Sequence, residues 1–362
     1  MAHPAMHTLR KTVSIVRLFL WALVWLAASG FAAAGEQSPR LPQKEVTFLA
    51  TSDVHYDAFE NEDRNDRVRD TLKYMNQVAG VPWPERLGGD PIARPRGVLV
   101  LGDLIDDGDR MFQGKNQGAR QWAYYLADFG LDGTDGLLKY RVFEGAGNHD
   151  GPPVGREKFG FSFQADLKKR NALRKQKDWL SNLAENGLHH SWDWEGVHFV
   201  QLNLYPSDKP HARGKYSPEY HDPQDALSFV KKDLESQVGV SGRPVILMSH
   251  YGFDCDWWHP EDWKAIYQAV KPYRVVLYLH GHTGTKCYDW KPEGEEQALT
   301  VVNTGQTENG FFVVQITADR LRAAYRAKRW TEEKTKEKTK DKKPQRTWDG
   351  TWEWRHLLDK KR

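Results

Sequence analysis

The sequence predicts an α/β protein in which buried strands alternate with helices. Five short apolar runs predict strands, and four of them lack polar alternation, which is typical of strands buried on both faces. Segments with apolar residues at helical spacing separate several of these runs. At 362 residues the chain is also long enough to bury a large core, as one big domain or as two.

The first 34 residues are expected to be a secretory signal peptide. Arg10 and Lys11 precede an apolar run at residues 18–28, and small residues follow at 32–35. This order is typical of a cleaved signal. Cleavage after Ala34 would leave a periplasmic or secreted protein without a stable membrane span. An uncleaved anchor is the alternative, although the apolar run is only marginally long enough to cross a bilayer.

The elements of the main domain, expected over residues 45–330, follow in order. The five buried strands are predicted at residues 46–51, 98–101, 140–144, 245–248 and 275–279. Helices are predicted from Asn65, over 117–129, over the basic stretch 164–186 and from Pro260. Alternating residues around Glu195 and Gly196 predict a hairpin over 190–203.

The C-terminal part is expected to be a run of antiparallel strands. They are predicted at residues 288–290, 299–303, 311–317 and 322–330. Residues 331–347 are charged and of low complexity, which indicates a linker or a solvated insertion. Residues 348–362 regain apolar side chains and are expected to dock back as a final strand.

Each of the five buried strands ends in side chains that can bind a metal ion. These are Asp53 and His55, then Asp103, Asn148, His250 and His282. We expect the strand ends to bring all six to one rim of a sheet. Imidazole and carboxylate ligands suit Fe, Zn or Mn. Two such ions about 3.5–4 Å apart would activate a water and hold phosphate oxygens. Asp103, on the central strand, is the expected bridging ligand.

The order of these motifs resembles that of the calcineurin-like metallophosphoesterases, which include purple acid phosphatases. The family series D-x-H, G-D-x-x-D, G-N-H-D/E, lone His and G-H-x-H corresponds to residues 53–55, 102–106, 147–150, 250 and 281–284. The resemblance implies a four-layered αββα sandwich of two mixed β-sheets flanked by helices. It also implies a metal-dependent phosphoesterase that uses a metal-activated hydroxide at a dinuclear site, and the predicted signal peptide would make this enzyme an exported one.

The resemblance also implies roles for individual residues. The first metal would be held by Asp53, His55 and Asp103, and the second by Asp103, Asn148, His250 and His282. His149 would protonate the leaving group or bind the phosphate, with Asp106 or Asp150 orienting it. Tyr56 and Tyr251 each follow a ligand directly and are candidate substrate-binding residues.

The chain departs from the family pattern at Gly284, where the family has a second histidine that ligates the first metal. The first site is therefore expected to persist but to bind its metal more weakly. The alternatives are a ligand from elsewhere, of which His280 is one candidate, or a single tightly held metal. A disulfide between Cys255 and Cys287 is compatible with export, and two separate thiols are the alternative.

The expected substrate is a phosphorylated small molecule or another phosphoester. The formal net charge is only +3, so composition gives no reason to expect a nucleic-acid partner. Two rival functions stay open. One is a non-catalytic metal- or ligand-binding protein on the same fold, which the missing histidine motivates. The other is a phosphodiesterase or nuclease.

Overall fold

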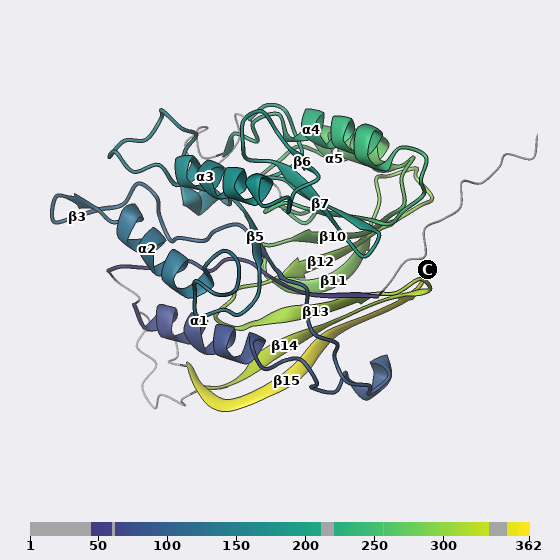
Figure 1. Cartoon of the computed structure of the whole chain (residues 1–362), viewed down its shortest axis with the longest axis horizontal. Helices are drawn as coiled ribbons and strands as arrows, with labels where there is room; N and C mark the ends of the chain where they lie inside the picture. Colours follow the sequence, from purple (N-terminus) through teal and green to yellow (C-terminus); the bar gives the residue numbers. More distant parts are fainter. Residues whose placement is uncertain (1–44, 60–61, 211–220, 256, 333–345) are drawn as a thin grey trace, which may run out of the picture. The chain divides into compact units, whose positions relative to one another are not determined.

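The computed structural model describes residues 45–59, 62–210, 221–255, 257–332 and 346–362 (Figure 1). The chain divides into the units Met1–Ser38 and Pro39–Arg362, and all described residues belong to the second. The expected signal peptide lies outside them. Within the described ranges, no helix has the length and apolar character needed to cross a bilayer.

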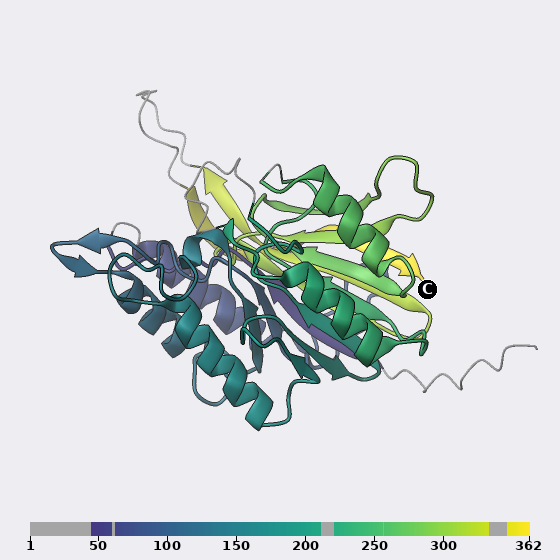
Figure 2. The ribbon, with the colours of Figure 1, turned by 90° about the horizontal axis from the view of Figure 1, so that it is seen from above.

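The predicted α/β fold is confirmed, with two mixed β-sheets facing each other (Figures 1 and 2). The first sheet has the order β15-β14-β13-β1-β2-β5. Its strands are β1 (Val46–Thr51), β2 (Val98–Leu101), β5 (Val142–Gly145), β13 (Gly310–Ile316), β14 (Arg320–Glu332) and β15 (Arg346–Lys361). Strands β1, β2 and β5 are parallel neighbours, whereas β13, β14 and β15 join antiparallel.

The second sheet has the order β11-β12-β10-β9-β8-β7-β6. Its strands are β6 (Asn182–Leu183), β7 (His190–Trp194), β8 (Val197–Gln201), β9 (Val245–Met248), β10 (Val275–His280), β11 (Thr285–Trp290) and β12 (Leu299–Thr304). Strands β8, β9, β10 and β12 run parallel, and the predicted hairpin is formed by β7 and β8. A separate small hairpin consists of β3 (Met111–Phe112) and β4 (Lys115–Asn116).

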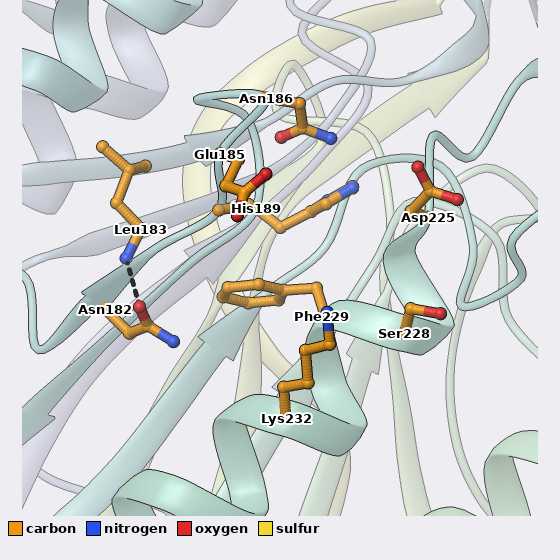
Figure 3. Close-up of a pocket in the computed structure, with 10 residues that line it drawn as sticks. Asn182, Leu183, Glu185, Asn186, His189, Asp225, Ser228, Phe229 and Lys232 are labelled. Carbon is orange, nitrogen blue, oxygen red and sulfur yellow. Dashed lines mark hydrogen bonds between the residues drawn. The ribbon is translucent and has the colours of Figure 1, made fainter.

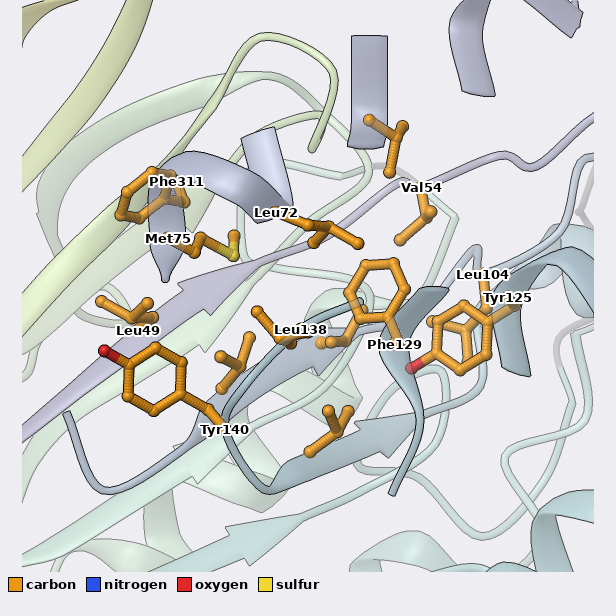
Figure 4. Close-up of a cluster of buried hydrophobic side chains, with 14 of the residues drawn as sticks. Leu49, Val54, Leu72, Met75, Leu104, Tyr125, Phe129, Leu138, Tyr140 and Phe311 are labelled. Carbon is orange, nitrogen blue, oxygen red and sulfur yellow. The ribbon is translucent and has the colours of Figure 1, made fainter. Parts of the chain in front are cut away.

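Alternation along the strands builds the layers. On β2, Val98 and Val100 pack into a cluster with the helices outside the first sheet, whereas Leu99 and Leu101 face the second sheet. Helices α1 (Glu62–Met75), α2 (Gly118–Phe129) and α3 (Phe163–Gln176) contribute to the first cluster, which Figure 4 shows in part. Helices α4 (Ala226–Asp233) and α5 (Pro260–Val270) cover the other face of the second sheet. The central strands of both sheets are therefore buried on both faces, whereas β15 and β11 at the sheet edges are largely exposed or half-buried.

A buried ion triad ties α3 to β5. Glu144, wholly buried on β5, accepts a hydrogen bond of 2.6 Å from Nε of Arg170 and pairs with Arg174. Burial alone would raise the pKa of Glu144, but the charges of both arginines lower it to about 2. Arg174 also donates to the carbonyl of Val142, so its charge is fully engaged.

Three features differ from the sequence-based expectations. The helix predicted over residues 164–186 ends at Gln176, because Asp178 adopts a left-handed backbone and residues 182–183 form β6. The strands at 299–303 and 311–317 are not neighbours in one antiparallel sheet, because β12 and β13 belong to different sheets. Cys255 and Cys287 are both free thiols, and the Sγ of Cys287 lies 3.4 Å from the carbonyl oxygen of His356 on β15.

Strand β15 pairs antiparallel along β14 over most of its length. Of the stretch expected to be a linker, residues 331–332 continue β14 and residues 346–347 begin β15. The remainder of that stretch lies outside the described residues.

Candidate metal centre

The six predicted ligands come from the ends of strands in both sheets, and not from one sheet as the strand pattern alone suggested. Asp53, His55, Asp103 and Asn148 follow β1, β2 and β5 of the first sheet, while His250 and His282 follow β9 and β10 of the second. Hydrogen bonds join the two sets. Nδ1 of His250 donates to the carbonyl of Leu101 at 2.8 Å, and the N–H of His282 donates to Asp53 at 2.9 Å.

An unusual backbone conformation turns four of these side chains toward one another. Asp53, His55, Asp103 and His282 have φ values of 49°, 48°, 52° and 71°. Left-handed backbone is uncommon for residues other than glycine and persists where the surroundings impose it. Such positions cluster at functional sites, so this geometry itself marks the strand ends as a site.

The glycines of the motifs let the ligand loops approach each other. Gly102 has a φ of 95°, as the predicted sharp turn requires. Gly147 has an ordinary φ, but a Cβ atom there would lie 2.1 Å from Oδ1 of Asp103. The loops after β2 and β5 are therefore in direct contact beside the central carboxylate.

The ligand atoms converge on Asp103. Nε2 of His250 lies 3.0 Å from Oδ2 of Asp103 and 3.0 Å from Oδ1 of Asn148. Nε2 of His55 lies 3.7 Å from both Asp53 and Asp103. Ligand atoms of Asp53, Asp103, His250 and His282 all lie within 4.8 Å of one another. The structure thus brings the six predicted ligands together around one carboxylate.

The electrostatics of the group fit a bound cation. Asp53 and Asp103 are both buried. Burial alone would raise the pKa of Asp53, but the polar interaction with His55, 3.7 Å away, and the charge of His250 lower it to about 2. Burial likewise opposes ionisation of Asp103, yet the charges of His250 and His149 hold its pKa well below the usual range. Two ionised carboxylates buried side by side call for positive charge, and this mixed set of donors suits a metal ion.

His149 faces the same centre. Its Nδ1 donates to the backbone carbonyl of Asp106 at 2.6 Å, which leaves Nε2 for other partners. Its ring lies 4.5 Å from that of His55, between centroids. Burial opposes protonation of His149, but the charges of Asp103 and Asp106 raise its pKa. This is a suitable state for a group that donates a proton.

Asp106 and Asp150 occupy different positions around His149. The carboxylate of Asp106 lies 3.9 Å from Nδ1 of His55 and is flanked by Arg64 at 3.3 Å and Arg110 at 3.1 Å. The carboxylate of Asp150 accepts three backbone N–H groups, from Leu104, Ile105 and Gly147. Burial and the charge of Asp103 raise the pKa of Asp150 to about 7. Asp150 therefore braces the loops after β2 and β5.

The two candidate substrate-binding tyrosines are both wholly buried. The hydroxyl of Tyr56 donates to Asp128 on α2 at 2.7 Å, so it is committed to the core of the first sheet. The ring of Tyr251 lies 4.7 Å from that of His282, and its hydroxyl lies 2.8 Å from Nδ1 of His221. The structure thus brings Tyr251 to the ligand group but directs Tyr56 away from it.

His221 is a further neighbour of the centre and was not among the predicted site residues. It is only 1% exposed, and its ring lies 5.2 Å from that of Trp257, which itself lies 4.5 Å from His282. Burial lowers the pKa of His221 to about 4. The sequence places this histidine in a loop over residues 205–222 that is rich in Pro, His and Tyr, where a surface position is favoured and a place along the substrate cleft is the alternative. No motif spacing marks the histidine itself.

The space beside Gly284 is open. A Cβ atom there would meet nothing within 4 Å, and the residue has a φ of 124°. His280, the alternative ligand, points elsewhere: its ring nitrogens lie 2.8 Å from the carbonyl of Gly281 and 2.9 Å from the hydroxyl of Tyr288. Among the described residues, His280 does not belong to a group that could hold a metal.

A cavity of about 780 Å³ lies apart from these ligands, between β6 and α4 (Figure 3). His189 lines it and is wholly buried, with Nε2 2.8 Å from the carbonyl of Gln224. Nδ1 of His189 accepts the N–H of Asn203 at 3.2 Å. Because both nitrogens are engaged, this histidine supports the fold around the cavity.

Comparison with known proteins gives a family. The family model for calcineurin-like phosphoesterases matches residues 46–285, and no curated protein sequence matches the chain. Similar solved structures include GAP50, the anchor in the inner membrane complex of Plasmodium (13% identity, TM-score 0.45, 78% of this chain and 84% of that one). A second is TT1561 of Thermus thermophilus (13% identity, TM-score 0.41, 75% of this chain and 94% of that one). A third is vacuolar protein sorting 29 from Cryptosporidium parvum (9% identity, TM-score 0.33, 88% of this chain and 99% of that one).

The family match covers more than half of the chain and includes all six predicted ligands. The resemblance inferred from the motif series is thereby confirmed, and the structural likenesses are too weak to add to it. This chain belongs to the calcineurin-like phosphoesterase family.

Proposed function

We propose that the protein is an exported hydrolase that cleaves phosphate esters at two metal ions, chosen from Fe, Zn and Mn. The observation that carries the proposal is the convergence of six donors from five strand ends on the carboxylate of Asp103. Membership of a phosphoesterase family supports the reaction class. The leader-like sequence at residues 1–34 supports export to the periplasm or the medium.

Asp103 would be shared between the two ions. Asp53 and His55 would complete the first set of ligands, and Asn148, His250 and His282 the second. When bound, the metal pair supplies an activated water and neutralises charge on the phosphate oxygens. Nδ1 of His250 is held by the carbonyl of Leu101, so its Nε2 is oriented toward the centre before any metal binds.

His149 would donate the proton that the departing alcohol needs. Its Nδ1 is fixed on the backbone carbonyl of Asp106, so Nε2 is the atom that carries this proton. The neighbouring carboxylates favour the protonated ring. Asp150 would hold the loop that carries His149 in place, because its carboxylate accepts hydrogen bonds from backbone N–H groups of both loops.

The first metal is proposed to bind more weakly than the second. Among the described residues, the ligands assigned to it are Asp53, His55 and Asp103, and the open space at Gly284 leaves room for water. Metal analysis after dialysis against a weak chelator tests this point. We expect one equivalent to be lost first, and two equally tight ions would contradict the proposal.

The main experiment compares Asp103→Asn with the wild type on aryl phosphate mono- and diesters, with and without chelator and added Mn or Zn. We expect the variant to lose both bound metal and turnover. Asp66→Asn, at an exposed aspartate of α1, is the matched control and should keep both. Wild-type turnover in Asp103→Asn would refute the assignment.

The missing histidine at Gly284 also keeps a non-catalytic binding protein as the second candidate function. That alternative predicts metal binding without hydrolysis of any ester. The comparison of mono- and diester substrates separates a phosphomonoesterase from a phosphodiesterase or nuclease.

A further inference from the structure

Exposed apolar side chains concentrate on the loops that carry the metal ligands. Six large apolar residues of the described chain are exposed, and four of them lie on the loops after β1, β2 and β5. These four are Phe59, Met111, Val154 and Phe159, at 37%, 41%, 45% and 44% exposure. Within the described residues, the loops at the opposite ends of these strands contribute none of the six.

Two of these loops meet beside the metal centre. Phe59 comes four residues after His55, and its ring contacts that of Phe112 at a tilt of 34°, with 3.5 Å between centroids. Phe112 and Met111 follow Arg110, whose Nη1 lies 3.1 Å from the carboxylate of Asp106. That carboxylate is 3.9 Å from the ring of His55. The aromatic pair of Phe59 and Phe112 is therefore adjacent in the chain to residues that contact the edge of the metal centre.

Polar contacts hold the aromatic pair in place. The β3–β4 hairpin turns at Gln113 and Gly114, both with positive φ, and stands out at the left of Figures 1 and 2. The amide of Gln117 donates to the carbonyl of Lys115 at 3.0 Å and closes the hairpin. The carboxylate of Asp57 accepts the N–H of Phe59 at 2.8 Å. The apolar surface is thus built into the fold.

The next loop extends this surface. The N–H of Lys158 lies 3.4 Å from the carboxylate of Asp109, so the loop that bears Val154 and Phe159 rests on the segment leading into the hairpin. Lys115, Arg156 and Lys158 are exposed among these apolar residues. An apolar surface with basic side chains suits a ligand that is anionic at one end and apolar at the other.

We propose that Phe59, Met111 and Phe112 bind the apolar part of the substrate while its phosphate lies at the metal centre. The substrate class is then an organic phosphate whose alcohol carries an alkyl chain or an aromatic ring. This inference rests on the proposed phosphoesterase function. A soluble alkyl phosphate and a lipid headgroup phosphate share this chemistry.

The test measures kcat/KM for ethyl, butyl and octyl phosphate below their micellar concentrations. For the wild type we expect kcat/KM to rise by about two- to fourfold per methylene that contacts the surface. Met111→Ser and Phe112→Ser should flatten this dependence, with Met111→Ser as the variant least able to disturb folding. Leu173→Ser, on α3 and 44% exposed, is the matched control and should keep the full dependence.

The outcomes distinguish the role of the apolar surface from the proposed phosphoesterase function. Hydrolysis of all three esters without a chain-length dependence overturns this inference and leaves the proposed function intact. No hydrolysis of any ester overturns both. Vesicles of phosphatidylglycerol and phosphatidylcholine, and sedimentation of the free protein, test other occupants. If Met111→Ser abolishes vesicle binding or self-association but keeps the chain-length dependence, the surface serves a membrane or a second copy instead.

Discussion

Substitution of Gly147 by alanine should disable the metal centre without removing any ligand. The added Cβ would lie 2.1 Å from Oδ1 and 2.3 Å from the backbone nitrogen of Asp103. Ordinary contact begins near 3.4 Å, so the carboxylate or the loop must move by more than an ångström. Because φ at Gly147 is −105°, the effect is steric and owes nothing to backbone strain.

The expected magnitude follows from that displacement. Misplacing a reacting or ligating group by about 1 Å can cost roughly 10²-fold in rate. Overpacking of this kind also destabilises a fold by about 1–3 kcal/mol. We therefore expect kcat/KM for an aryl phosphate to fall about 100-fold and metal affinity to fall with it.

A matched control separates the site from general stability. Gly97, at the start of β2, also has no positive φ, and a Cβ there would lie 2.7 Å from the ring of Trp194. Gly97→Ala should lower the melting temperature but keep the metal affinity and turnover of the folded protein. Titration calorimetry measures the metal affinity of both variants, scanning calorimetry their melting temperatures, and hydrolysis assays their turnover. If Gly147→Ala binds metal and turns over like the wild type, the packing argument is wrong.

Further predictions concern stability. Glu144→Gln should lower the free energy of unfolding, measured with urea, by roughly 3–5 kcal/mol, because it leaves two buried arginines without their carboxylate partner. The wild-type contribution should be present above pH 4.5 and lost as pH falls through about 2, since folding lowers the pKa of Glu144. Burial lowers the pKa of His189 to about 4, so its contribution should be present above pH 6.5 and lost toward pH 4. The free energy of unfolding should therefore fall by about 3 kcal/mol between pH 6.5 and pH 4, and this fall should be smaller in His189→Asn. Chelation should lower the unfolding free energy, by about 2.7 kcal/mol for metal at a hundred times its Kd. Unreduced, denatured protein should titrate with two thiols, at Cys255 and Cys287, and a single disulfide would contradict the structure.

The sequence predicts the strand framework well because its strands are buried on both faces. A run such as residues 98–101 has no polar residue to suggest another element, and β2 has those same bounds. The helix over residues 164–186 was extended too far, because Trp179, Leu180 and Leu183 continue the apolar spacing beyond Lys177. The left-handed turn at Asp178 that ends this periodicity is a backbone property, which the residue types indicate only weakly.

The clustering of the six candidate ligands was predictable because each of them follows the end of a recognisable strand. The features that could not be predicted from the sequence are mostly tertiary contacts between side chains and distant elements. Nothing in the spacing tells that His250 reaches across to the carbonyl of Leu101 in the other sheet. The same is true of the hydroxyl of Tyr56, which points to Asp128 on α2. The contact of His221 with the hydroxyl of Tyr251 is likewise tertiary, because no spacing in the sequence links these two residues.

The pairing of β1 with β13 has a consequence for how the protein is made. Val46 lies opposite Ile316, so β1 cannot complete its place in the sheet until most of the chain has been synthesised. At about 5–20 residues per second, this strand waits for some tens of seconds. It is entirely apolar or threonine, and the edge that will meet β13 is therefore prone to aggregate until that partner is made. Low expression temperature and ample chaperone capacity should accordingly raise the yield of soluble protein.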